Sequence, residues 1–500
     1  MKKQKPFARS HGVLMPIFSL DSPYGIGTLG SPCFRFVDFL CRAGATFWQM
    51  LPVGPTGYGD SPYQCFSAFA GNPYFLDPEW FVNKGWLPKE NLNLFIYENN
   101  GRVNYDHLFK TRKTALKKAY LGFLNKATKA DKTAYKNFKG QNNYWLDDYT
   151  SFMAIKSHFK GIGREGFGKF ALKDTDSVNF ASGYLADEKD FYAFLEFAFD
   201  RQFNELKDYA GQKGILLIGD IPLYVSNDSA DIWAHPNLFL VSGSGHPTDV
   251  AGVPPDIFSK TGQLWGNPLY NWQEMEKDNF LWWQNRVKRQ SQMFDIIRID
   301  HFLGICNYYK IPATATTAVN GVWCKGPGEK LINAINIAAG NTTFIAEDLG
   351  PAGDDVFALL KRCGYPKMAV MQFAFDGGDN PNLIHNIPKN CVAYTGTHDN
   401  QTLCGFFENA PITARKFARK YLGVRRTADL PDAVIRHLFL SPANTVIVPL
   451  YDYLKLGNTA RINTPAGMGG NWCWRVGANN LNMLADSILT LAKIYNREKF

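Results

Sequence analysis

The sequence predicts an α/β protein, a (β/α)8 TIM barrel with a helical and a loop-rich insertion. Short apolar runs alternate with helical stretches along the 500 residues, and no linker or low-complexity tract divides them. Acidic residues follow three of these runs, as expected where several strands end at one barrel mouth. A minimal barrel needs only about 250 residues. We interpret residues 1–500 as a single catalytic barrel domain whose additional length forms insertions.

Eight short runs have the β-branched and aromatic content typical of buried parallel strands, which is the number that a closed barrel needs. The shortest of them is 74–76. The predicted strands are 46–51, 74–76, 215–218, 294–299, 343–346, 368–373, 392–395 and 445–450.

Two gaps between these runs are too long for single barrel helices. Residues 79–195 have the periodicity of amphipathic helices, clearest at 115–121, and predict a helical insertion subdomain. Residues 221–290 contain six prolines and many glycines, which indicates a loop-rich insertion over the barrel mouth. Loops on that face commonly build the substrate site.

Composition excludes several classes of protein. The sequence contains no run of roughly 18 uncharged apolar residues, which argues against a membrane span. The N-terminus lacks the apolar stretch of a secretory signal. Nine scattered cysteines without Cys-x-x-Cys spacing indicate reduced thiols and a cytoplasmic protein.

The net charge of +9 is spread over segments such as 110–118 and 126–139, which favours a solvated basic surface and no nucleic-acid partner, with a polyanion site as the alternative. Aromatic residues make up 15% of the chain, and their rings stack well on the flat faces of sugars. Most of them are nevertheless expected in the core.

The strongest candidates for catalysis are three acids that follow strand-like runs: Asp300, Glu347 and Asp399. A retaining glycosidase needs one carboxylate as nucleophile and a second, about 5–5.5 Å away, as acid and then base. Asp300 and Glu347, after the fourth and fifth predicted strands, suit this pair. Arg298 favours the negative charge that a nucleophile needs, and Glu347 requires a raised pKa to act as an acid.

Each acid also has a structural interpretation. Arg298 and Asp300 can form an ion pair, and Glu347 can cap the next helix. His398 and Asp399 can form a metal site or a helix cap. The occurrence of all three acids at strand ends favours catalysis.

Several longer motifs resemble the amylomaltases, the 4-α-glucanotransferases of glycoside hydrolase family 77. The similarity extends from about residue 9 to 475 and includes the acid motifs. The other matching segments are 48–64, 67–74, 219–222, 251–256, 265–270 and 470–475.

The resemblance implies that Asp300 is the nucleophile, Glu347 the acid/base and Asp399 a transition-state stabiliser that binds sugar hydroxyls. Hydrogen bonds to the sugar 2-hydroxyl strengthen as positive charge develops on the ring. Trp265 and Trp48 have simple core burial as an alternative. The resemblance further implies that the substrate-binding residues are Tyr58, Ser61, Tyr63, Asp220, Asp256, Trp265, Asn267, Arg298, His301, His398 and Asn463.

The chain departs from the family pattern in three places. Residues 16–18 read Pro-Ile-Phe where many relatives have His-Pro-Thr, and Gln401 replaces a common Asp. The loop 462–467 is one residue off the usual Asn-x-Pro-Gly, and its glycine supplies either a hinge or a turn. These differences bear on acceptor preference and product size, since every catalytic acid is present.

The resemblance thus implies transfer of 1,4-α-glucan segments to the 4-hydroxyl of glucose or of another glucan. Carboxylates handle both the protons and the covalent link, so we expect no metal or organic cofactor. The partners expected are maltooligosaccharides. An α-glucan hydrolase with the same acids and a non-catalytic glucan-binding protein are the alternatives.

Overall fold

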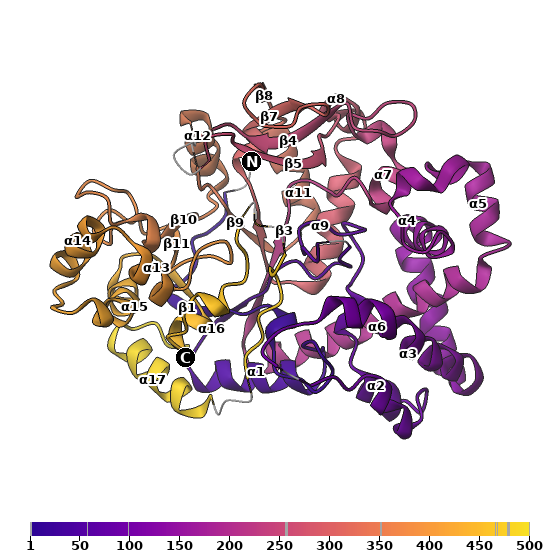
Figure 1. The fold of residues 1–500 in the computed structure, drawn as a ribbon, viewed down its shortest axis with the longest axis horizontal. Helices are drawn as coiled ribbons and strands as arrows, with labels where there is room; N and C mark the ends of the chain where they lie inside the picture. Colours follow the sequence, from indigo (N-terminus) through magenta and orange to yellow (C-terminus); the bar gives the residue numbers. More distant parts are fainter. Residues whose placement is uncertain are drawn as a thin grey trace.

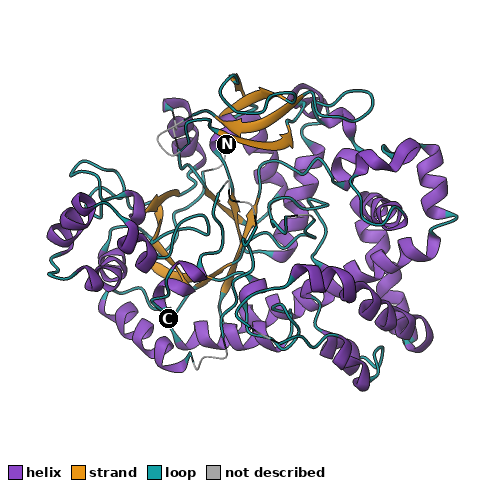
Figure 2. Cartoon of the chain, in the orientation of Figure 1, coloured by secondary structure: helices purple, strands orange, loops and turns teal. Residues whose placement is uncertain are grey.

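The computed structural model of the chain is an eight-stranded parallel barrel enclosed by helices (Figures 1 and 2). It describes residues 3–57, 59–98, 100–255, 259–350, 353–465, 467, 469–477 and 481–499. The barrel strands are β1 (Ser10–Leu14), β2 (Phe47–Gln49), β3 (Leu216–Ile221), β6 (Ile296–Ile299), β9 (Thr343–Ala346), β10 (Lys367–Val370), β11 (Cys391–Tyr394) and β12 (Thr445–Pro449).

The strands follow one another around the barrel in the order β10-β11-β12-β1-β2-β3-β6-β9. Two contacts join the ends of this series. The backbone N–H of Ala346 donates to the carbonyl of Pro366 at 3.2 Å. The carboxylate of Asp348 accepts from the N–H of Met368 at 2.9 Å. The predicted (β/α)8 fold is therefore confirmed.

One predicted strand is wrong. Residues 74 and 75 belong to a turn of 3-10 helix, Pro73–Phe75, and Leu76 caps its end, because Pro73 begins the turn and the Asn72 side chain accepts from the N–H of Tyr74. The missing barrel strand is β1, which precedes every predicted run. It carries Gly12 where β1 approaches β2 closely, since an added Cβ would lie 2.6 Å from Cβ of Phe47.

Strand burial explains the apolar composition. Every residue of β6, β11 and β12 is buried, because the barrel interior covers one face of each strand and helices cover the other. Arg298 is the charged residue of β6, a strand whose other residues are isoleucines, and its side chain is buried with them. Buried charge of this kind requires partners, and those partners belong to the candidate site.

Helices enclose the barrel on the outside (Figure 1). One of them, α12, shows how the sequence sets its ends: two aspartates occupy its first turn, Lys361 and Arg362 its last, and Gly364 ends it with a φ of 77°. The helices that follow β1 and the later strands are α1 (Ser31–Arg42), α9 (Leu281–Met293), α10 (Leu303–Cys306), α11 (Glu329–Ala338), α12 (Asp354–Cys363), α13 (Leu403–Asn409), α14 (Ile412–Leu422), α15 (Leu430–Leu440), α16 (Leu450–Tyr453) and α17 (Asn482–Ile494).

The chain between β2 and β3 is largely helical and lies at the right of Figure 1. A capping box of Thr128 and Asp131 starts its longest helix. Phe123 packs against Phe194 with ring centroids 5.1 Å apart, so an aromatic core joins helices from both ends of this segment. Its helices are α2 (Pro78–Asn83), α3 (Tyr105–Lys126), α4 (Lys129–His158), α5 (Thr175–Ser182) and α6 (Ala186–Gln212).

The segment between β3 and β6 holds more regular structure than its prolines and glycines predict: helices α7 (Ala230–Ala234) and α8 (Trp272–Lys277), and strands β4 (Asp249–Val253) and β5 (Gln263–Pro268). These strands join β7 (Asn307–Pro312) and β8 (Val322–Lys325) in an antiparallel sheet at the top of Figure 1. Val250, Tyr309, Ile311 and Ala318 form its own small core.

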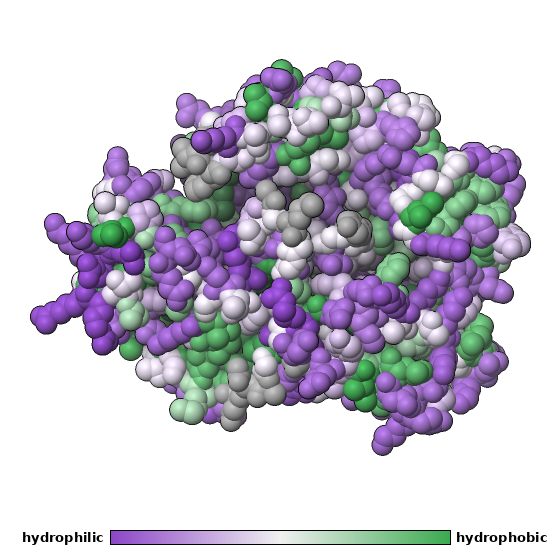
Figure 3. Space-filling model, in the orientation of Figure 1, coloured by the Kyte–Doolittle hydropathy of each residue, from purple (hydrophilic) through white to green (hydrophobic). Residues whose placement is uncertain are grey.

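The surface drawn in Figure 3 is mostly hydrophilic, with hydrophobic residues in scattered patches. No helix in the described part of the chain is long and apolar enough to cross a bilayer. All nine cysteines lie in this part, and each is a free thiol.

Candidate active site

Asp300 and Glu347 leave neighbouring barrel strands at the same level. Ile299 of β6 pairs with Ala346 of β9, and each acid is the next residue. The N–H of Glu347 donates to the carbonyl of Ile299 at 3.0 Å. On the other side of β6, Arg298 pairs with Asp220 of β3. The ends of three adjacent strands therefore bring four ionisable side chains together.

Arg298 connects two of the carboxylates. Its Nη1 donates to both oxygens of Asp220, at 2.8 and 2.7 Å, and to Oδ1 of Asp300 at 2.9 Å. The side chain of Asp220 is 0% exposed and that of Asp300 is 29% exposed. Burial alone would lower the pKa of Arg298. The negative charges of Asp220 and Asp300 have a larger effect in the opposite direction, so the net pKa is raised and the guanidinium stays charged. Asp220 is thus a buried partner of Arg298, and Asp300 faces the open site.

Glu347 is held by two backbone donors. Its Oε2 accepts from the N–H of His301 at 2.7 Å, and its Oε1 accepts from the N–H of Leu349 at 2.9 Å. Burial and the negative charge of Asp300 raise the pKa of Glu347 to about 8, although Arg298 and the two N–H groups oppose this shift. The raised pKa favours the protonated form of Glu347, which is the form that a general acid needs.

Asp399 lies in the loop after β11 with two polar partners. Asn463 Nδ2 donates to its Oδ1 at 2.6 Å, and His398 Nε2 lies 3.3 Å from its Oδ2. Burial alone would raise the pKa of Asp399, but the His398 charge and these hydrogen bonds lower it to about 2. Asp399 raises the pKa of His398 in return, against the effect of burial. The two shifts therefore favour a negative Asp399 beside a positive His398.

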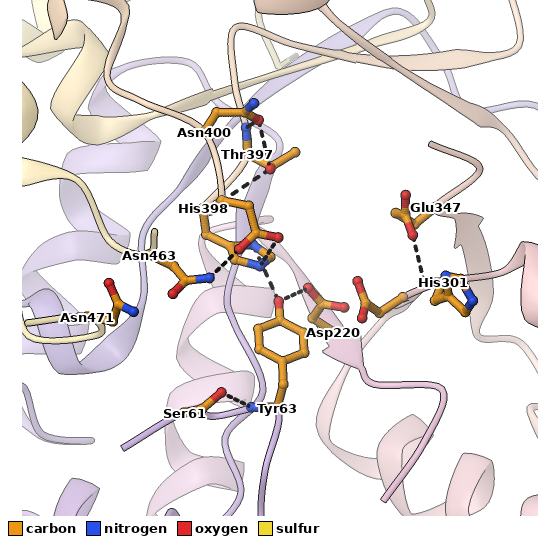
Figure 4. Close-up of polar contacts among 12 residues, drawn as sticks. Ser61, Tyr63, Asp220, His301, Glu347, Thr397, His398, Asn400, Asn463 and Asn471 are labelled. Atoms are coloured by element: carbon orange, nitrogen blue, oxygen red, sulfur yellow. Dashed lines mark hydrogen bonds and ion pairs between the residues drawn. The ribbon is translucent and has the colours of Figure 1, made fainter. Parts of the chain in front are cut away.

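Tyr63 links the two halves of the site (Figure 4). Its hydroxyl donates to Oδ2 of Asp220 at 2.8 Å and lies 3.4 Å from Nδ1 of His398. The Tyr63 and His398 rings stack with centroids 4.9 Å apart. The N–H of Tyr63 donates to the hydroxyl of Ser61 at 3.3 Å, which fixes the loop that carries it. Opposite them in Figure 4 lie Glu347 and His301.

Two further predicted residues line the same region. The ring of Trp265, in β5, meets that of His301 edge to face at 4.8 Å. The amide of Asn267 is buried and donates to the carbonyl of Val225, while its Oδ1 accepts from Gln64 Nε2 at 2.8 Å. This amide pair connects the Tyr63 loop to β5 across 203 positions of sequence. Gln64 was not singled out, although it lies in a motif that carries the resemblance.

The structure thus gathers ten of the predicted residues in one cluster, joined by side-chain contacts and by the chain connection between Asp300 and His301: Tyr63, Asp220, Trp265, Arg298, Asp300, His301, Glu347, His398, Asp399 and Asn463. Ser61 and Asn267 adjoin this group through the Tyr63 loop. Tyr58 and Asp256 lie outside the described residues. Within the described ranges, no group of three His, Cys, Asp or Glu side chains is arranged to hold a metal ion.

Comparison with known proteins identifies the family of the chain. Residues 15–480 match the profile of glycoside hydrolase family 77, described as 4-alpha-glucanotransferase. The chain is 44% identical to the 4-alpha-glucanotransferase of Clostridium butyricum over 97% of its length and 100% of that protein. It is 42% identical to the 4-alpha-glucanotransferase of Thermus thermophilus, over 94% of this chain and 95% of that one.

Among solved structures, the amylomaltase from Streptococcus agalactiae in complex with acarbose superposes with a TM-score of 0.94 at 36% identity, covering 98% of this chain and 100% of that one. The amylomaltase from Corynebacterium glutamicum shares the fold, with a TM-score of 0.81 at 17% identity over 98% of this chain and 75% of that one. From the family profile and the curated relatives, the chain belongs to glycoside hydrolase family 77, the 4-alpha-glucanotransferases.

Proposed function

We propose that this 4-α-glucanotransferase transfers segments of a 1,4-α-D-glucan by a retaining double displacement through a covalent glycosyl-enzyme intermediate. The acceptor is the 4-hydroxyl of glucose or of another 1,4-α-glucan. One observation carries this mechanism: Asp300 and Glu347 directly follow adjacent strands and lie in opposite environments. Asp300 lies beside a guanidinium, while Glu347 is buried with a pKa of about 8.

In the first step, Asp300 attacks the anomeric carbon of the donor while Glu347 gives its proton to the glycosidic oxygen that leaves. Oδ1 of Asp300 accepts from Arg298. In the described part of the chain, no hydrogen bond or ion pair holds Oδ2. We assign the attack to Oδ2, because its lone pairs are free to form the bond to carbon.

In the second step, the ionised Glu347 takes the proton of the acceptor 4-hydroxyl, whose oxygen attacks the anomeric carbon and releases Asp300. The same carboxyl thus serves as acid and then as base. Transfer replaces hydrolysis when a bound sugar hydroxyl reaches the intermediate before water does. The reaction balances with these two carboxyl groups alone, so we propose no metal or organic cofactor.

Asp399 is proposed to bind donor sugar hydroxyls and to stabilise the positive ring of the transition state. Its low pKa and its bonds to His398 and Asn463 keep a negative charge in a fixed place. The remaining proposed substrate-binding residues are Tyr58, Ser61, Tyr63, Asp220, Asp256, Trp265, Asn267, Arg298, His301, His398 and Asn463.

We further propose that residues 1–500 form one catalytic domain in which 79–195 and 221–290 are insertions, and that the enzyme acts in the cytoplasm on maltooligosaccharides. The acarbose complex of the Streptococcus agalactiae amylomaltase supports an oligosaccharide groove.

The α-glucan hydrolase is the second candidate, since it would use the same acids. Incubation with maltotriose separates the two. Transfer yields glucose together with maltooligosaccharides longer than maltotriose, whereas hydrolysis yields only shorter sugars. Products confined to glucose and maltose would overturn the transferase assignment.

A further inference from the structure

We propose that Arg461 is a positioning residue that holds Asp399 and Asn463 as one rigid unit. This inference rests on the proposed role of Asp399 in binding the donor sugar. Arg461 belongs to the segment that follows the last barrel strand, and no motif in the sequence singles it out.

The loop that carries Asp399 is held from the chain after β12. Asp452, which is buried, accepts from the hydroxyl of Thr395 at 2.6 Å and from the N–H of Leu403 at 2.7 Å. The hydroxyl of Tyr451 donates to the carbonyl of Thr397 at 3.1 Å. Both ends and one inner position of the loop are therefore fixed to α16. The contact at Asp399 itself comes from Arg461.

Arg461 bridges Asp399 and Asn463, two residues proposed to bind the substrate. Its Nη2 donates to the backbone carbonyl of Asp399 at 2.7 Å, and its Nε donates to the backbone carbonyl of Asn463 at 2.7 Å. The side chain of Asn463 donates to Oδ1 of Asp399, and its N–H donates to the carbonyl of His398. These contacts close a ring in which the backbones and side chains of Asp399 and Asn463 are both joined.

A guanidinium suits this position because its donors form a planar fork with fixed spacing. Arg461 is half-buried, and burial lowers its pKa. It forms no ion pair with a carboxylate in the described part of the chain, so its charge strengthens hydrogen bonds to two carbonyls. An arginine that only kept the surface hydrated would point into solvent, whereas Arg461 donates to the carbonyls of Asp399 and Asn463.

The expected consequence is kinetic. Loss of the fork releases Asp399, and a displacement of about 1 Å can cost about 100-fold in rate. We expect Arg461→Ala to lower kcat for maltotriose disproportionation by about 10- to 100-fold and to change KM much less. Arg461→Lys, which keeps a charged donor without the fork, should lose only part of this rate. Arg426→Ala removes an arginine from an exposed ion pair with Asp429 and is the matched control, with unchanged kcat.

The decisive experiment is a double-mutant cycle with Asp399→Asn, measured with maltosyl fluoride so that slow variants stay measurable. If Arg461 acts through Asp399, Arg461→Ala slows the wild type but has less than a threefold effect in the Asp399→Asn background. Equal effects in both backgrounds, or full activity of Arg461→Ala, would overturn the inference. Should Arg461→Ala fail to fold by circular dichroism, the same cycle is run with Arg461→Lys. Full activity of Asp399→Asn would instead overturn the proposed function.

Discussion

The N–H of His301 donates to Glu347 Oε2 at 2.7 Å. The backbone that follows the fourth barrel strand therefore holds the carboxyl group of the residue that follows the fifth strand. His301 has a φ of 52°, a left-handed conformation that non-glycine residues rarely adopt. Such conformations gather at functional sites, where the surrounding structure maintains them. Here the turned backbone aims an N–H at the proposed acid/base.

The pH dependence of the reaction should report the ionisation of Glu347. Above pH 8 this residue loses the proton that the leaving oxygen requires, because its pKa is about 8. We expect kcat/KM for maltotriose to fall roughly tenfold per pH unit on the alkaline side. A maltosyl fluoride donor is the control, since fluoride leaves without an acid and its first step should lack this alkaline loss. An equal loss with both donors would assign the limb to another group.

Glu347 should also link stability to pH. Its ordinary value is 4.5, so between about pH 4.5 and 8 the folded protein keeps a proton that the unfolded chain has lost. The free energy of unfolding therefore falls as pH rises through this window, by on the order of 1 kcal/mol per unit. Glu347→Gln cannot titrate and should become more stable than the wild type across the same window. Urea unfolding of both proteins at pH 5 and 8 checks this, and a constant difference would refute it.

Loss of either central acid should stop transfer without unfolding the protein. Glu347→Gln should lower kcat on maltotriose by about 10²- to 10⁴-fold, the usual contribution of a general acid. Asp300→Asn removes the nucleophile and should abolish transfer. Both should still bind maltooligosaccharides in calorimetry, because the aromatic and hydroxyl-binding side chains remain. Transfer at the wild-type rate in either variant would contradict the roles assigned to these residues.

Arg298 should be needed for folding as well as for catalysis. Its removal in Arg298→Gln leaves Asp220, whose side chain is 0% exposed, without its charged partner. Breaking a buried pair in this way costs about 3–5 kcal/mol. The double variant with Asp220→Asn should recover part of this loss, since the uncompensated charge is gone. The free energies of unfolding from urea titrations give the comparison, and additive losses in the double variant would argue against it.

The sequence predicted the barrel and seven of its strands because their apolar runs are buried on both faces. It missed Ser10–Leu14, since Ser10, His11 and Gly12 make that strand look polar. His11 is nevertheless 0% exposed in the barrel wall. The run at 74–76 has aromatic strand-like composition, but Pro73 and the cap from Asn72 favour a helical turn. Tertiary contacts in the first case and local capping in the second override composition.

The three acids were recognisable because each follows a strand, a position that sequence order reveals. Arg461 was not, because its partners are backbone carbonyls, which carry no side-chain signature. The pair of Gln64 and Asn267 joins residues 203 positions apart, and no pattern in one sequence reports such a contact. The roles of individual site residues stay predictions that the experiments above address.

Trapping the glycosyl-enzyme intermediate would test the double displacement most directly. Glu347→Gln is incubated with a maltotriosyl fluoride that lacks its terminal 4-hydroxyl, so that the sugar cannot act as acceptor. Fluoride departs without an acid, and the variant lacks the base for the second step, so the intermediate accumulates. Peptide mass spectrometry should then find the mass of the added 4-deoxymaltotriosyl group on Asp300. An adduct on another residue, or none while fluoride is released, would contradict a double displacement through Asp300.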